Sequence, residues 1–216
     1  MNIGIDIDGV LTDIQAFHFK HGTPFFKKKF SRDVVDKEHY DVREIFKCSE
    51  KEWHAYWKKH LLKYVMFEPA RKEAKEIIRK LRNDGHSVFI ITKRVFTCQD
   101  DFMGNFMRFI VRVWLLLNGI FYKKIVFCDN DVADSKKSAC LKNHIDIIID
   151  DEPVNIETVS SITKVICFDT SYNHGCEGEN VFRARNWEEI YRLIAKINLG
   201  EIKKWRVEKA TEIKFL

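Results

Sequence analysis

The sequence predicts an α/β fold organised around a parallel, five-stranded sheet. Apolar runs of strand length recur along the chain, and runs with the length and spacing of helices separate the later ones. Such alternation is typical of a parallel sheet that helices cover on both faces. The chain has 216 residues, of which 45% are hydrophobic, so it is long enough for one domain with its own core.

Five segments have the apolar character expected of strands. They comprise residues 2–7, 87–91, 124–128, 145–149 and 164–168. Five further segments have the apolar spacing of helices, and these comprise residues 70–83, 100–118, 136–143, 154–161 and 187–197. The first of these helices has the clearest boundaries, because Pro69 precedes it and Gly85 follows it.

The segment between the first two strands differs from the rest, because it contains no good strand candidate. Ser49 and Glu52 match a capping box at the start of a helix. Four aromatic or apolar residues then follow at helical spacing, namely Trp53, Trp57, Leu61 and Tyr64. We therefore expect a small helical cap at residues 14–67, inserted after the first strand into a core formed by residues 1–13 and 68–199.

The composition favours a cytoplasmic protein. The formal net charge of +5 is dispersed along the chain, which is a mild bias toward anionic ligands and weak evidence for nucleic acid. The six cysteines form no Cys-x-x-Cys pair, so reduced thiols fit better than disulfides or zinc. No signal peptide or membrane span is expected, since the longest apolar stretch covers only residues 113–117. The oligomeric state and the role of the charged tail at residues 200–216 stay open.

Two carboxylates at the end of the first strand are the most informative feature. Alternate residues of an extended chain share a face, so Asp6 and Asp8 point the same way, and Gly9 then allows a sharp turn. Two like charges this close are costly unless a cation or a shared proton compensates. Such a pair suits phosphoryl transfer, in which one carboxylate attacks phosphorus and the other moves the proton. The same motif also serves as a metal clamp in glycosyltransferases.

The second strand ends in residues suited to a phosphate. Thr92 can donate a hydrogen bond to a phosphate oxygen without adding charge. Lys93 and Arg94 follow directly, and the guanidinium of Arg94 has the forked geometry that binds phosphate. An ordinary strand end with solvated charges explains the same residues, so both interpretations stay open.

The fourth predicted strand, like the first, is an apolar run that ends in two aspartates. It brings Asp150 and Asp151 to the carboxyl edge of the sheet, where open α/β sheets place their ligands. Mg²⁺ prefers carboxylates, water and substrate phosphate, and Asp6, Asp150 and the backbone carbonyl of Asp8 supply such a set. Asp151 is expected to coordinate through water or to orient its neighbours. The alternative is that these acids cap the helix that begins near Pro153.

A lysine upstream of this acidic pair completes the candidate site. Lys136 and Lys137 both lie at the start of a short predicted helix, where an ammonium offsets the charge of carboxylates and phosphate. We favour Lys136, because it lies four residues before Cys140 and so shares a helix face with it. Lys137 remains the alternative.

Taken together, these motifs resemble the haloacid dehalogenase (HAD) superfamily of phosphotransferases. Its four motifs match in order, with residues 6–10 first, then the strand that ends in Thr92, then a lysine, and last the pair Asp150 and Asp151. The resemblance implies a Rossmann-like core and a type-1 cap, which is a cap inserted between the first two motifs.

The resemblance also implies roles for the site residues. Asp6 would be the nucleophile and Asp8 the general acid and base. Thr92 and Lys136 would bind the phosphate. Mg²⁺ would be held by Asp6, Asp8 and Asp150.

The similarity covers most of residues 1–198 and is greatest to the branch of 5′(3′)-deoxyribonucleotidases and related nucleotidases. The segments that carry it are residues 40–46, the helix with Trp53 and Trp57, and residues 85–94, 149–153, 168–173 and 183–190. This branch implies a small phosphomonoester as substrate.

We therefore expect a Mg²⁺-dependent phosphomonoesterase that works through an aspartyl-phosphate. A nucleoside 5′-monophosphate is the favoured substrate, because Phe25, Phe26 or Tyr40 of the cap could stack on a base. One alternative is a phosphatase for a sugar or polyol phosphate from a biosynthetic pathway, since the cap and not the core selects the leaving group. The other is a binding or regulatory module without turnover.

Overall fold

The computed structural model of the chain describes residues 1–132 and 134–201, so nearly all of the tail at residues 200–216 lies outside the described residues. The core is a parallel sheet in the order β3-β2-β1-β4-β5-β6, which confirms the α/β class. Its strands are β1 (Asn2–Ile5), β2 (Ser87–Thr92), β3 (Lys124–Phe127), β4 (Ile147–Asp150), β5 (Lys164–Phe168) and β6 (Val181–Ala184).

The sheet has six strands, so the predicted number of five is wrong. The additional strand, β6, lies at the edge of the sheet and pairs in parallel with β5 over its whole length. Arg183 interrupts its apolar run, which hides the strand from a search for apolar periodicity. The guanidinium of Arg183 donates to Asp169 (2.7 Å) and to the carbonyl of Asn173 (2.9 Å). These hydrogen bonds form only in the folded chain, so they leave no sign in the sequence.

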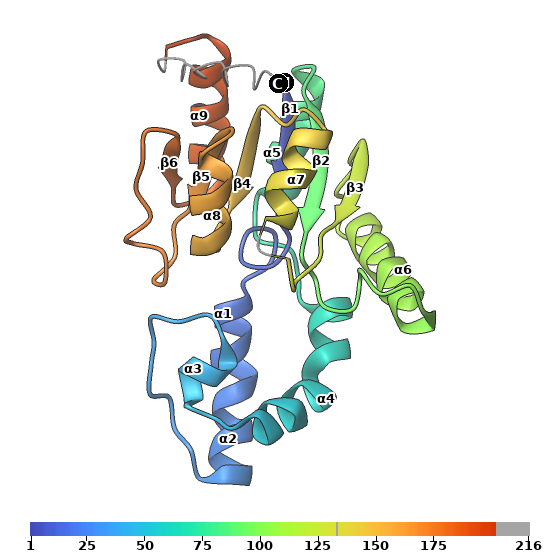
Figure 1. Cartoon of the computed structure of the whole chain (residues 1–216), viewed down its shortest axis with the longest axis vertical. Coiled ribbons are helices and arrows are strands. Elements are labelled where there is room, and N and C mark those ends of the chain that lie inside the picture. The colour runs from blue at the N-terminus through green and yellow to red at the C-terminus, as the bar shows by residue number, and fades with distance from the viewer. Residues whose placement is uncertain (133, 202–216) are drawn as a thin grey trace, which may run out of the picture.

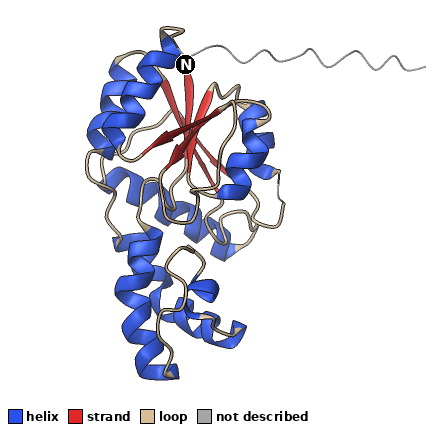
Figure 2. Cartoon of the chain, turned by 90° about the vertical axis from the view of Figure 1, so that its left-hand side faces the viewer, coloured by secondary structure: helices blue, strands red, loops and turns tan. Residues whose placement is uncertain are grey.

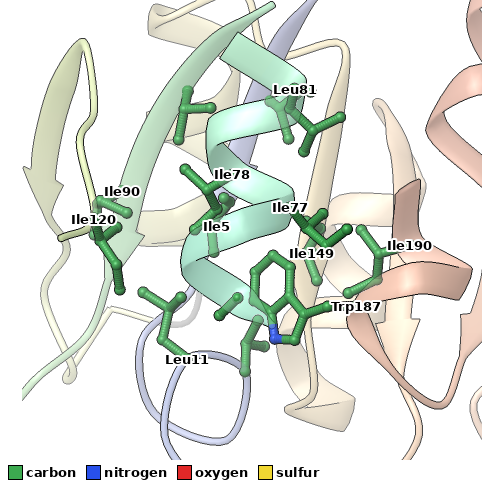
Figure 3. Close-up of a cluster of buried hydrophobic side chains, with 14 of the residues drawn as sticks. Ile5, Leu11, Ile77, Ile78, Leu81, Ile90, Ile120, Ile149, Trp187 and Ile190 are labelled. Carbon is green, nitrogen blue, oxygen red and sulfur yellow. The ribbon is translucent and has the colours of Figure 1, made fainter. Parts of the chain in front are cut away.

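Helices cover both faces of the sheet (Figure 2). One face carries α5 (Ala74–Asn83), α6 (Phe102–Leu117) and α9 (Trp187–Asn198), and the other carries α7 (Ser135–Lys142) and α8 (Pro153–Ser160). Figure 3 shows the first face, where Ile77 and Ile78 of α5 pack over Ile5 and Ile149 of the central strands. The predicted helix at residues 70–83 begins later, at Ala74, because Glu73 has a left-handed backbone with φ 70°.

The segment between β1 and α5 forms a helical layer beyond the carboxyl edge of the sheet (Figure 1). It contains α1 (Ile14–Phe17), η1 (His18–Gly22), α2 (Thr23–Phe30), α3 (Val42–Phe46) and α4 (Glu50–Phe67). The structure describes all of residues 14–67 and places no strand among them. The predicted capping box is present, with Ser49 and Glu52 exchanging hydrogen bonds at the start of α4. The helical content predicted for this segment is therefore confirmed.

The helical segment at residues 14–67, called the cap below, has an aromatic core of its own. Phe26 stacks on Phe46 with 4.4 Å between ring centroids, and Phe25 meets Tyr56 edge-on at 5.6 Å. Phe26, Phe46 and Tyr56 are fully buried, and Phe25 nearly so. Stacking of Phe25 or Phe26 on a substrate base stays a prediction, and the packing of both rings within the cap argues against it.

Among the described residues, no helix combines the length and the apolar character that crossing a membrane requires.

A histidine buried in the cap predicts acid sensitivity. His18 is 1% exposed, and its Nδ1 lies 2.9 Å from the hydroxyl of Tyr56. Burial lowers the pKa of His18 to about 3, whereas an unfolded chain protonates it near pH 6.5. Below pH 6.5 the unfolded state therefore binds a proton that the folded state does not, and the free energy of unfolding falls as the pH is lowered.

Between pH 7 and pH 5 this single histidine should cost about 2 kcal/mol of stability. Urea unfolding at both pH values tests it with His18→Gln, which cannot titrate and should lose about that much less stability than the wild type. His54→Gln is the matched control, since His54 is exposed on α4. Equal pH slopes for the wild type and His18→Gln would contradict the assignment.

Candidate active site

The candidate site lies where β1, β2 and β4 end, facing the cap (Figure 1). Asp6 follows β1 and donates its backbone N–H to the carbonyl of Ile149 (3.0 Å), which places it beside Asp150 on the neighbouring strand. Thr92 ends β2 on the other side of β1 and is fully buried. The parallel register thus brings the predicted residues of three strands to one edge of the sheet.

Three carboxylates form a buried cluster at this edge. Oxygens of Asp6, Asp150 and Asp151 lie within 4.8 Å of one another, and none of the three residues is more than 5% exposed. The ammonium of Lys136 lies among them, 3.0 Å from Asp6 Oδ2 and 2.6 Å from Asp150 Oδ2. Lys137 is partly exposed, so the structure places Lys136 in the cluster and not Lys137.

The electrostatics of this cluster favour an additional cation. Burial raises the pKa of Asp6 to about 7; the charges of Asp150 and Asp8 add to this rise, and Lys136 opposes it. Burial likewise raises the pKa of Asp151, with further rises from Asp150 and Asp6. Lys136 is protonated, because the two carboxylates raise its pKa by more than burial lowers it.

The donor set fits a divalent metal ion. One ammonium cannot neutralise three carboxylates once all of them are ionised, and hard cations such as Mg²⁺ bind ionised carboxylate oxygens. Oδ1 of Asp6 and Oδ1 of Asp151 are both buried without a hydrogen-bond partner. A buried oxygen without a partner is costly, and a bound cation removes that cost.

Asp8 occupies a different environment from Asp6. Arg94 donates from Nε to Asp8 Oδ1 (3.1 Å) and from Nη2 to the same oxygen (2.5 Å), and the hydroxyl of Tyr64 donates to it as well (2.6 Å). Burial raises the pKa of Asp8, but the ion pair with Arg94 and the hydrogen bonds outweigh burial, so the pKa lies below its ordinary value. The Asp8 carboxylate therefore lies outside the cluster around Lys136. Metal binding by Asp8 stays a prediction, and it would involve the backbone carbonyl.

Arg94 pairs with Asp8. Its guanidinium is 2% exposed, lies over the ring of Tyr64 (5.2 Å) and forks onto Asp8. Nη1 of Arg94 is buried without a partner, so phosphate binding through that atom stays a prediction. Lys93 lines the cavity at the site, and its role also stays a prediction.

Gly9 is required by the packing of the site. Its φ is +89°, and a Cβ at this position would lie 1.8 Å from Oδ2 of Asp151. The backbone N–H groups of Leu11 and Thr12 both donate to the carbonyl of Ile7, which closes the turn. The turn after β1 thus presses directly against the acidic cluster.

A cavity of about 220 Å³ opens onto the carboxylates. Ile14 and Tyr40 of the cap line one side, and Lys93 and Asn130 of the core loops line another. The hydroxyl of Tyr40 donates to Glu152 (3.0 Å), which ties the cap to the loop after β4. Of the three aromatic residues considered for stacking, only Tyr40 borders this cavity.

Several site residues escaped the sequence interpretation. Tyr64 was expected only on an apolar helix stripe, and its contact with Asp8 depends on how α4 approaches the core. Tyr172 donates to Asp151 across the loops after β4 and β5, and Asn155 donates to Asp150 (3.3 Å). Only Asn155 had a signal, because it lies one turn into the helix that follows the acidic pair.

Comparison with known proteins identifies the family. Residues 1–199 match the family described as 5′ nucleotidase, deoxy (pyrimidine), cytosolic type C protein. This chain belongs to that family. A nucleotidase of Clostridium acetobutylicum is 24% identical over 200 residues, which are 91% of this chain and 95% of the relative. The 5′(3′)-deoxyribonucleotidase of the same organism is 27% identical over 195 residues, covering 88% of this chain and 93% of the relative.

Solved structures agree on the fold. A predicted phosphoglycolate phosphatase from Haemophilus somnus superposes with a TM-score of 0.60 at 13% identity, covering 89% of this chain and 96% of the other. A HAD-superfamily hydrolase from Geobacter sulfurreducens gives a TM-score of 0.55 at 12% identity, with 89% and 95% covered. The fold that the resemblance to the HAD superfamily implies is thereby confirmed. As a member of the cytosolic type C nucleotidase family, the chain is a phosphoric monoester hydrolase, and the alternative of a module without turnover is set aside.

The placement of Lys136 predicts that replacing it lowers activity far more than replacing the adjacent Lys137. Lys136→Met leaves Asp6 and Asp150 without their shared cation, so kcat/KM on p-nitrophenyl phosphate should fall by about 10²–10³. Lys137→Met removes an equal charge from the next residue and should stay close to the wild type. Circular dichroism of both variants checks that the fold is retained. A larger loss for Lys137→Met would reverse the assignment.

Proposed function

We propose that this chain is a Mg²⁺-dependent phosphomonoesterase that hydrolyses a nucleoside 5′-monophosphate through a phosphorylated Asp6. One observation carries the proposal, namely that two aspartates a single residue apart occupy opposite environments. Asp6 lies in the acidic cluster with Lys136, whereas Asp8 is held apart by Arg94 and Tyr64. Pairs of carboxylates in contrasting environments are how enzymes divide nucleophilic and proton-transfer roles.

In the first step, Oδ1 of Asp6 attacks phosphorus, and the bond from phosphorus to the ester oxygen breaks. That Asp6 oxygen has no hydrogen-bond partner within the protein, so it is free to attack. The leaving oxygen takes a proton from Asp8. Asp8 is ionised at rest because of Arg94. The negative charge of an incoming phosphate raises its pKa, so Asp8 takes up one proton from solvent as the substrate binds and passes that proton to the leaving oxygen.

In the second step, water attacks the phosphorus of the phosphorylated Asp6. Asp8 takes a proton from that water, and the bond from phosphorus to Asp6 breaks to release inorganic phosphate. Lys136 stabilises the charge that gathers on Asp6 as it leaves. Thr92 is proposed to donate its hydroxyl to a phosphate oxygen, which adds a hydrogen bond without charge.

Mg²⁺ would be held by Asp6, Asp150 and the backbone carbonyl of Asp8, with Asp151 bound directly or through water. When bound, it would neutralise the phosphate and the carboxylates and act as a Lewis acid on the phosphoryl group. The buried Oδ1 of Asp151, which has no hydrogen-bond partner, and the placement of three carboxylates around one ammonium support this assignment.

The nucleotide assignment is supported by the family description and by Tyr40. The family is described by deoxynucleotide chemistry, and one relative is a 5′(3′)-deoxyribonucleotidase. Tyr40 borders the cavity and presents the aromatic surface that a base requires. The cavity of about 220 Å³ is small, however, and this favours the second candidate, a phosphatase for a compact sugar or polyol phosphate. We also propose the cytoplasm as its location, because small phosphomonoesters are substrates found there.

Removal of metal should abolish activity. Excess EDTA should stop hydrolysis of p-nitrophenyl phosphate, and added Mg²⁺ should restore it, because the carboxylates and phosphate cannot otherwise share one site. Asp150→Asn should raise the Mg²⁺ concentration needed for half-maximal activity more than Asp151→Asn does, since Tyr172 already engages one oxygen of Asp151. Asp100→Asn on the surface serves as the control. Full activity in excess EDTA would refute the metal requirement.

The substrate class is decided by comparing kcat/KM on one preparation. Deoxynucleoside monophosphates should exceed ribonucleoside, sugar and polyol phosphates. If a sugar or polyol phosphate exceeds the best nucleotide about 100-fold, roughly 2.7 kcal/mol of transition-state preference, the nucleotide assignment fails and the phosphatase assignment stands.

Variants of Tyr40 separate stacking from catalysis in the same assay. Tyr40→Ala should lower kcat/KM for the nucleotide about tenfold while sparing a polyol phosphate, which has no ring to stack, because one base stack is worth about 1–3 kcal/mol. Tyr40→Phe keeps the ring and loses only the hydrogen bond to Glu152, so it should retain most nucleotide activity.

A further inference from the structure

The outer face of α6 is apolar and exposed. Sixteen large apolar side chains are exposed among the residues that the structure describes, and six of them lie on this one helix, namely Phe102, Met103, Phe106, Phe109, Leu116 and Leu117. Phe102 is 84% exposed and Leu117 is 77% exposed. Figure 1 shows α6 at the edge of the molecule, beyond the edge strand β3.

The inner face of the same helix is also apolar. Met107, Val111 and Trp114 are buried, where they pack on the cap and on the sheet. A helix with apolar residues on two faces normally buries both of them. The outer face of α6 therefore needs a cover that the described part of this chain does not provide.

The spacing along the outer face indicates that the cover is another helix. Phe102, Phe106, Phe109, Val113 and Leu116 follow one another at intervals of four, three, four and three residues. This is the a and d repeat through which two helices interdigitate. The rings of Phe102 and Phe106 already lie nearly parallel, with 6.4 Å between centroids, and form a flat apolar ledge.

The charged residues of α6 are turned aside from this seam. Arg108 donates to the carbonyls of Thr97 (2.7 Å) and Gln99 (2.9 Å) in the loop before the helix. The guanidinium of Arg112 lies 5.2 Å from the ring centre of Phe127 on β3. Both cations thus bind to their own protomer and leave the apolar seam clear of charge.

We propose that the α6 seam is the interface through which two copies of this chain form an antiparallel, twofold dimer. Phe109 is the middle residue of the seam, so a twofold axis beside it sets Phe109 against its own copy. The same axis sets Phe102 against Leu116 of the other protomer. A surface that matches itself in this way is what an isologous dimer requires.

The available area is sufficient for a stable contact. A fully exposed aromatic side chain offers ~200 Å². The six exposed side chains of α6 then offer roughly 700 Å² per protomer, close to the ~800 Å² per partner of standard interfaces. A membrane surface fits this helix less well, because interfacial helices carry a strongly charged opposite face and the opposite face of α6 is core.

Sedimentation velocity on the full chain tests the proposal. The wild type should sediment as a dimer across about 1–100 µM protein, and Phe109→Glu should sediment as a monomer. Val154→Glu is the matched control, because Val154 is also half exposed but lies on α8, and it should remain a dimer. Thermal unfolding of both variants checks that each is folded.

Cross-linking supplies a second measurement, which detects the proximity of two protomers directly and does not rely on dissociating the dimer. In a Cys98→Ser background, which removes the exposed thiol nearest α6, Phe109→Cys should form a disulfide between protomers under mild oxidation. Phe102→Cys alone should not, because the axis separates the two copies of that position. A monomeric wild type, a dimer unaffected by Phe109→Glu, or a monomer that floats with anionic phospholipid vesicles would each overturn the proposal.

Discussion

The site depends on one buried ammonium held between two carboxylates. Lys136 reaches from the start of α7 to Asp6 and Asp150, which end neighbouring strands, and all three are almost fully buried. Removing ions from water costs several kcal/mol each, and the cost is met only when charges pair closely. Asp151 is a third carboxylate beside them, and Lys136 cannot neutralise all three once they are ionised. The pKa values of Asp6 and Asp151 are raised for this reason and because of burial, and a bound cation would favour their ionised forms.

The cap contacts Asp8 as well as lining the cavity at the site. Tyr64, near the end of α4, lies 2.8 Å from the hydroxyl of Thr12 and donates to Asp8. Arg94 completes the same network from the loop after β2. Asp8 is therefore positioned jointly by a cap helix and by the core. A change in how α4 meets the core would alter the surroundings of Asp8, the proposed proton-transfer group, directly.

Much of this arrangement could be predicted from the sequence, because strand ends carry local signals. Apolar runs followed by Asp6, Thr92 and Asp150 place those residues at one sheet edge, and this needs only the parallel order of the strands. The orientation of Arg94 could not be predicted, since its contact with Asp8 depends on tertiary packing. The strand β6 was missed for a related reason. Arg183 interrupts its apolar run, and only the folded structure shows that this charge pairs with Asp169.

The central claim is that Asp6 becomes phosphorylated during turnover. The most direct measurement is acid quench within a single turnover of substrate labelled in its phosphate, followed by proteolysis and mapping of the label by mass spectrometry. The account predicts label on the peptide that contains Asp6, lost in Asp6→Asn and unaffected in Lys137→Met. Label on another residue, or full single-turnover product formation with no labelled protein at any quench time, would contradict it.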